Sequence, residues 1–94
     1  MAAYVIGHIS VKDEAKWSEY RRQVPGTLEP WGAKVLFRGK RTAVLSGEHG
    51  YTDTVVIAFP DRQAVEGWHG SSAYQSLISV RNEAAEIILI SYED

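Results

Sequence analysis

Three basic side chains could carry chemistry in this sequence of 94 residues, namely His8, Arg38 and Arg81. The imidazole of a histidine titrates near neutral pH and can serve as a general acid or base. The guanidinium of an arginine can bind a carboxylate or an enolate oxygen through two parallel hydrogen bonds. His8 is therefore the candidate catalytic residue, and Arg38 and Arg81 are candidate ligand-binding residues.

The placement of His8 and Arg81 permits a functional and a structural interpretation. His8 follows Tyr4 and Ile6 on one face of an extended segment, so its ring would face a second layer on that side. Arg81 shares a predicted helix face with apolar residues, so it must reach water along its aliphatic stem or meet an anion. The structural alternatives are a hydrogen-bonded core histidine and an ion pair of Arg81 with a glutamate or a partner chain.

Aromatic residues at helical spacing are the third group of candidates. Tyr20, Trp68 and Tyr74 could line a pocket, because aromatic rings offer large apolar surfaces with a polar group at one end. Their spacing is first of all typical of core residues. Contact with a ligand is the further hypothesis, and we predict all three as ligand-binding residues.

Several kinds of site are absent from the sequence. It has no cysteine, which excludes disulfides, thiolate metal sites, iron–sulfur clusters and a cysteine nucleophile. No two histidines have the i, i+4 spacing of a helical metal site, and phosphate loops and nucleophile elbows are missing. His69 is predicted at a helix end, where a cation is favourable. We therefore predict no metal and no cofactor, while a metal held by residues distant in sequence stays open.

The charge and hydropathy of the chain restrict its partners. Ten Lys and Arg against twelve Asp and Glu give a net charge of −2, which argues against a nucleic-acid binder. No stretch approaches the roughly 20 apolar residues that cross a bilayer. The sequence opens without the pattern of a secretory signal. We expect a soluble cytoplasmic protein with neither a nucleic-acid nor a membrane partner.

Hydrophobic periodicity predicts one α+β domain over residues 1–94, with the order strand, helix, strand, strand, helix, strand. Asp13 and Asp61 are predicted to cap helices, Pro25-Gly26 to end the first, and Ser72 with Gln75 to form a capping box that restarts the second. The predicted strands cover residues 4–10, 34–38, 42–46, 54–59 and 86–92, where 34–38 and 42–46 could be one bent strand or a tight hairpin.

Both alternating faces of the first and last predicted strands are apolar, as in Tyr4-Val5-Ile6 and Ile87-Ile88-Leu89-Ile90. A strand that is buried on both sides needs cover on both. Two helices can cover only one face of a four-stranded sheet. We therefore predict a homodimer whose sheets pack face to face.

The sequence resembles the domain-of-unknown-function family 1330 along essentially its whole length. The resemblance rests on Phe37-Arg38-Gly39, on Phe59-Pro60, on the block from Ser72 to Leu77, and on Arg81. It implies a ferredoxin-like βαββαβ sandwich with helices on one face of an antiparallel sheet, assembled as a dimeric α/β barrel with pockets. It implies no reaction.

Three functions remain in competition at this point. The first is the binding of a small organic ligand, a carboxylate or an aromatic compound, in a pocket between sheet and helices. The second is a cofactor-free monooxygenase or isomerase, in which His8 is the acid or base and Arg38 or Arg81 stabilises an oxyanion. The third is a structural dimer without a ligand.

Overall fold

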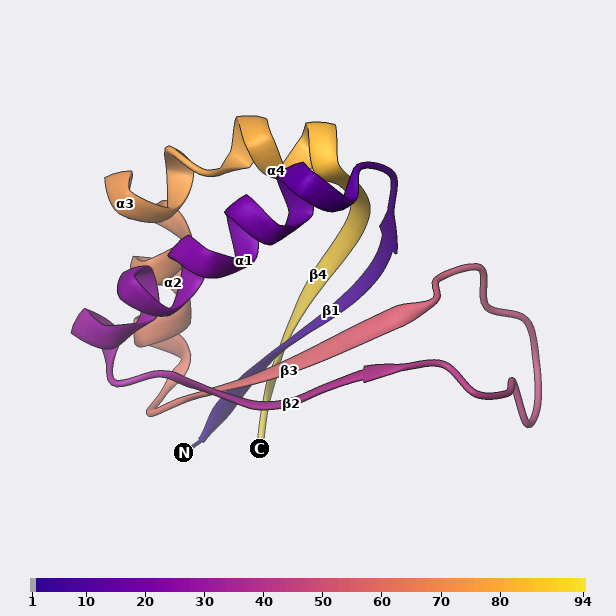
Figure 1. Cartoon of the computed structure of the whole chain (residues 1–94). Coiled ribbons are helices and arrows are strands. Elements are labelled where there is room, and N and C mark those ends of the chain that lie inside the picture. Colours follow the sequence, from indigo (N-terminus) through magenta and orange to yellow (C-terminus); the bar gives the residue numbers. More distant parts are fainter. Residues whose placement is uncertain (1) are drawn as a thin grey trace.

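An antiparallel sheet of four strands carries all the helices on one of its faces (Figure 1). The structure is a computed structural model that describes residues 2–94. The strands lie in the order β2-β3-β1-β4. This arrangement confirms the predicted α+β, ferredoxin-like fold. The elements along the chain are β1 (Ala3–Val11), α1 (Glu14–Leu28), the 3-10 helix η1 (Glu29–Trp31), β2 (Lys34–Lys40), β3 (Asp53–Phe59), α2 (Arg62–Gly70), α3 (Ser72–Gln75), α4 (Ile78–Ala84) and β4 (Ala85–Glu93).

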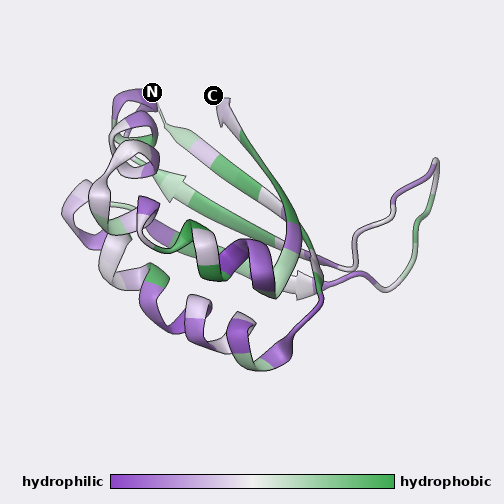
Figure 2. Cartoon of the chain, turned by 90° about the horizontal axis from the view of Figure 1, so that it is seen from above, coloured by the Kyte–Doolittle hydropathy of each residue, from purple (hydrophilic) through white to green (hydrophobic). Residues whose placement is uncertain are grey.

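The core lies between the sheet and the helices, and the strands reach it through every second residue. On β1, Ala3, Val5, Gly7 and Ile9 are buried, whereas the residues between them are only partly covered. Gly7 fits a close approach, because a Cβ there would lie 2.9 Å from Cγ1 of Val55. Hydrophobic residues predominate in the strands, with neutral and hydrophilic residues between them, whereas the helices are mostly hydrophilic with isolated hydrophobic bands (Figure 2).

Helix α1 begins as predicted and ends later than predicted. The side chain of Asp13 accepts a hydrogen bond from the backbone N–H of Lys16 at 3.1 Å, which caps the first turn. Pro25 lies inside the helix and does not end it. The expected break was wrong because the buried side chains of Val24 and Leu28 continue the apolar stripe across the proline.

The connection from α1 to the sheet is tight, and the connection after β2 is long. Gly32 takes the left-handed conformation with φ of 66° at the end of η1, which allows a sharp turn of the chain before β2. The predicted strand over 42–46 was wrong. Residues 41–50 are exposed and belong to a loop that projects beyond the sheet (Figure 1), where Val44 and Leu45 find no strand to pair with.

The second half of the chain repeats strand and helix with one more interruption than predicted. Asp61 caps α2 by accepting a hydrogen bond from the N–H of Ala64 at 2.8 Å. The cap of α3 is Ser71, one residue earlier than predicted, and its hydroxyl accepts from the N–H of Tyr74. Gln75 donates its side-chain N–H to the carbonyl of His69 instead of completing a capping box.

The face of the sheet opposite the helices is open and apolar. Ile88, Ile90 and Tyr92 of β4 project from it and are 41%, 39% and 50% exposed. Phe37 of β2 lies on the same face, opposite Val56, and is 57% exposed. Within residues 2–94, no helix combines the length and apolar character needed to cross a membrane.

Candidate functional site

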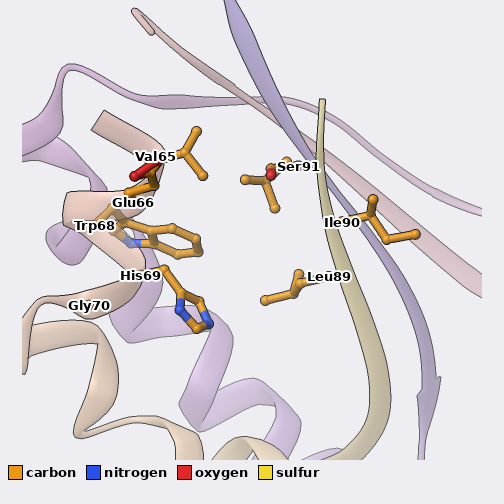
Figure 3. A pocket seen from close by; sticks show the side chains of 9 residues that line it. Val65, Glu66, Trp68, His69, Gly70, Leu89, Ile90 and Ser91 are labelled. Atoms are coloured by element: carbon orange, nitrogen blue, oxygen red, sulfur yellow. The ribbon is translucent and has the colours of Figure 1, made fainter. Parts of the chain in front are cut away.

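A cavity of about 390 Å³ opens between helix α2 and strand β4, on the helix side of the sheet. In Figure 3, Val65, Trp68 and His69 lie on the helix side, and Leu89 and Ser91 face them from the strand. The side chain of Ile90 points to the other side of β4, so this residue contributes its backbone. The lining is Val5, Val65, Glu66, Trp68, His69, Gly70, Leu89, Ile90 and Ser91.

Trp68 forms a fixed apolar wall of this α2–β4 cavity. Its ring is 1% exposed and packs against the rings of Phe59 and Tyr74, with centroid distances of 5.4 and 4.2 Å. Its indole N–H donates to the hydroxyl of Thr27 at 3.0 Å, and that hydroxyl donates to the carbonyl of Val24. Because its only polar atom already has a partner, Trp68 offers the cavity an apolar surface alone.

Polar groups lie at the edge of the α2–β4 cavity. The His69 ring packs 5.6 Å from the ring of Tyr74 and is otherwise exposed. The carboxylate of Glu66 pairs with Arg62 at 3.4 Å on the surface of α2. The sequence identified Trp68 but not His69, Glu66 or Ser91. There was little reason in the sequence to choose His69, because a histidine at a helix end is already explained by its favourable interaction with the helix dipole.

Tyr20, Tyr74 and Arg81 form a hydrogen-bonded chain that runs from the core to the partly exposed Arg81. The two phenol oxygens lie 2.8 Å apart, and Nη1 of Arg81 donates to the Tyr74 oxygen at 3.1 Å. Burial, then the proximity of Tyr74, raises the pKa of Tyr20 well above the usual value, and the charges of Arg81 and Arg38 oppose that shift. The inward position of Arg81 is thus explained by its hydrogen bond to the phenol of Tyr74. Glu83, a candidate partner for an ion pair with Arg81, pairs with Lys16 instead.

Arg38 lies on the helix side of β2, opposite Val55. Burial and, to a lesser extent, the nearby charge of Arg21 lower the pKa of its guanidinium. It borders two hollows, of about 420 and 300 Å³, both shared with Arg21 of helix α1. These hollows lie at the β2 edge of the sheet, whereas the α2–β4 cavity lies at the β4 edge.

His8 lies on the open face of the sheet, away from the other predicted site residues. Its Nδ1 is 3.2 Å from the hydroxyl of Thr54. The rings of His49 and Tyr51, from the loop after β2, approach it with centroid distances of 4.8 and 6.4 Å. The sequence did not suggest this cluster, because the two histidines are 41 positions apart and no periodicity connects them.

The predicted residues therefore fall into three places. Tyr20, Tyr74 and Arg81 come together in the core near Arg38, Trp68 borders the α2–β4 cavity, and His8 lies on the opposite face. The combination of His8 with Arg38 or Arg81 in one pocket, which the monooxygenase and isomerase hypothesis needs, is not formed within residues 2–94. In that same part of the chain, no three His, Cys, Asp or Glu side chains gather to hold a metal.

Comparison with known proteins agrees with this fold. Residues 2–93 match the family described as domain of unknown function DUF1330. A protein of unknown function from Rhodopseudomonas palustris is 15% identical with a TM-score of 0.84, over 99% of this chain and 82% of that one. A dimeric ferredoxin-like protein of unknown function from Jannaschia sp. CCS1 is 12% identical with a TM-score of 0.80, over the whole of both chains.

A structure of described activity also shares the fold. SnoaB, a cofactor-independent oxygenase from Streptomyces nogalater, is 7% identical with a TM-score of 0.69, over 99% of this chain and 92% of that one. None of the curated proteins compared with the sequence matches it. At these identities the likeness to solved structures establishes the fold and leaves the activity open.

Proposed function

The chain belongs to the family of the domain of unknown function DUF1330, and from this premise we propose that it is a homodimer that binds a small aromatic molecule in the α2–β4 cavity. The observation that carries the proposal is the cavity itself. Its volume of about 390 Å³ lies in the range of small-molecule sites, roughly 300–1,000 Å³. It lies between sheet and helices, where the sequence predicted a pocket.

The lining of the α2–β4 cavity favours an aromatic ligand over a carboxylate. Val65, Trp68 and Leu89 present apolar surface on which a flat ring can pack. No arginine or lysine lines the cavity, and the carboxylate of Glu66 at its edge would repel a second carboxylate. His69 and Ser91 can exchange hydrogen bonds with one hydroxyl or carbonyl group, which makes a phenol-like compound the best match.

The homodimer is supported by the open face of the sheet. Phe37, Ile88, Ile90 and Tyr92 leave a large apolar area in water, and such areas commonly mark interaction sites. A second copy of the same face would cover it. The structurally similar Jannaschia protein is described as dimeric, which is consistent with this arrangement.

The proposal is tested by titrating the protein with phenol, 2-naphthol and benzoate while recording the amide and indole N–H signals by NMR. We expect 2-naphthol to shift the Trp68 indole signal and the amide signals of α2 and β4 in a saturable way. Benzoate should bind more weakly than 2-naphthol. His69→Ala should weaken binding by about three- to tenfold, the effect of one hydrogen bond. The matched control is His49→Ala, on the other face, which should bind like the unmodified protein.

A second variant fills the cavity. Ser91 is exposed at the edge of the cavity, so Ser91→Phe can place a ring there without disturbing the core. Binding should then be lost while the melting temperature changes little. Unaltered binding by Ser91→Phe, or no response to any compound, would contradict the proposal, and the second result would favour a structural dimer without a ligand.

A further inference from the structure

We propose that the groove between α1 and β2 is a binding site for a small oxyanion, a carboxylate or a phosphate group, held by Arg21, Arg22 and Arg38. This arginine groove has a volume of about 420 Å³ and is distinct from the α2–β4 cavity, which lies at the opposite edge of the sheet. Three guanidinium groups and a hydroxyl border it, and no acidic residue does. The lining is Ser18, Arg21, Arg22, Pro25, Val35 and Arg38.

The helical wall of the groove follows from the sequence of α1. Ser18, Arg21, Arg22 and Pro25 have the spacing i, i+3, i+4 and i+7, which places them along one face of a helix. The neighbouring stripe of α1, which includes Trp17, is buried in the core. The arginines are therefore presented side by side by an element that the core holds in place.

The strand wall of the groove depends on an irregularity in β2. The pairing of β2 with β3 shifts between Val35 and Phe37, so that Val35 pairs with Ile57 and Arg38 with Val55. Without this shift, strict alternation would place residues 35 and 38 on opposite faces. The irregularity turns Arg38 toward the helices and Phe37 toward the open face, as β-bulges commonly redirect side chains near functional sites.

The charges in the groove are not neutralised by the chain itself. Within residues 2–94 the ion pairs are Lys16–Glu83, Lys40–Asp53 and Arg62–Glu66, and none includes an arginine of the groove. Arg38 is half-buried and near Arg21, a costly arrangement for two cations. An oxyanion would relieve the repulsion and accept charge-assisted hydrogen bonds from the guanidinium forks.

The adjoining hollow leaves room for the body of a ligand. It has a volume of about 300 Å³, shares Arg21 and Arg38 with the groove, and is also bordered by Trp17. Lys40 borders it too, but its charge is paired with Asp53 at 3.5 Å. The cations that remain for an anion are thus the arginines, whose planar geometry matches carboxylate and phosphate oxygens.

The test is an NMR titration of the tag-free protein at low ionic strength, with inorganic phosphate in one arm and acetate in the other. We expect saturable shifts of the amide signals of α1 and β2. The anion with the lower Kd, phosphate or acetate, is the preferred oxyanion. Arg38→Gln should raise the Kd at least tenfold, as expected for a lost hydrogen bond to a charged group. Arg62→Gln, which removes an exposed arginine of α2, should leave the Kd unchanged.

Two results would overturn the proposal. One is equal weakening by Arg38→Gln and Arg62→Gln, which would indicate general attraction of anions to the surface. The other is the absence of saturable shifts in both arms. Arg21→Gln, at an exposed position, gives a second measurement if Arg38→Gln does not fold. Because the Trp68 indole signal reports on the α2–β4 cavity, the two binding proposals can fail independently.

Discussion

The phenols of Tyr20 on α1 and Tyr74 on α3 are buried and share one hydrogen bond, and Arg81 donates a second to Tyr74. The raised pKa of Tyr20 shows the cost of ionising a phenol there, where burial outweighs the favourable charges of Arg81 and Arg38.

Stability should consequently fall at alkaline pH. In the unfolded chain Tyr20 ionises near pH 10, whereas in the folded chain it keeps its proton. Above that pH the folded state therefore binds more protons than the unfolded state, and the free energy of unfolding decreases as pH rises. Urea unfolding of the unmodified protein and of Tyr20→Phe between pH 8 and 11 checks this.

The Tyr20→Phe variant should lose about 1 kcal/mol at pH 8, because the partner phenol loses a hydrogen bond, and should show a shallower decline above pH 10. Tyr4, Tyr51 and Tyr92 are common to both proteins and, unlike Tyr74, make no hydrogen bond with Tyr20, so they cancel in the comparison. If the free energy of unfolding declined equally with pH in both proteins, Tyr20 would not be the cause of the decline.

Single residues also show how far a site can be predicted from the sequence. Trp68 was predictable, because its place in an apolar stripe puts it in the core beside any cavity. Arg21 and Arg22 were not, because cations on the polar face of a helix are usually solvated. The side to which Arg38 points was not predictable either, since it depends on a shift in strand pairing that leaves no periodic signal.

At the scale of elements, α1 is held by packing more than by helix propensity. It contains Pro25 and Gly26, two poor helix formers, and still continues to Leu28. The proline lacks the N–H that would donate to the carbonyl of Arg21, and its ring crowds that carbonyl. The helix persists because Val24 before the proline and Thr27 and Leu28 after it are buried.

Replacing this proline should therefore stabilise the protein. We expect Pro25→Ala to raise the free energy of unfolding by about 1–3 kcal/mol, since it restores a hydrogen bond and removes the clash. Gln23→Ala, at an exposed position of the same helix, is the control and should change it by less than about 0.5 kcal/mol. A lower stability of Pro25→Ala would mean that α1 depends on the bend that the proline introduces.

The order of strands and helices was predictable because period-2 and period-3.6 patterns alternate along the chain. The boundaries were predicted less well where packing overrides local signals, as at Pro25. The expected strand over 42–46 shows the opposite case. Thr42 and Val44 favour an extended chain, but the sheet offers no neighbouring edge at that point, and they remain in an exposed loop.

At the scale of the whole molecule, helices cover one face of the sheet and leave the other in water (Figure 1). If a second copy covers the open face, a charge placed among the apolar residues of that face should separate the two copies. Ile88→Lys places an ammonium group on this face and should shift the mass measured by sedimentation from twice 10.5 kDa to 10.5 kDa. Burial of an unpaired charge in an apolar interface is the reason.

The matched control for this variant lies in the projecting loop. Leu45 is 96% exposed and belongs to no strand of the sheet, so Leu45→Lys should keep the dimeric mass. A mass of 10.5 kDa for the unmodified protein would refute the homodimer. Dissociation by Leu45→Lys alone would instead locate the interface at the loop.

The pairing of the outermost segments of the chain has a topological consequence. Strands β1 and β4 are neighbours, with Ala3 opposite Glu93, and the N–H of Asp94 donates to the carbonyl of Ala2 at 3.0 Å. The two ends lie near each other in Figure 1, far from the loop after β2. The backbone therefore follows a nearly closed circuit, and circular permutation becomes feasible: a short linker can join the ends while new termini open within the exposed residues 41–50, leaving every strand pair intact.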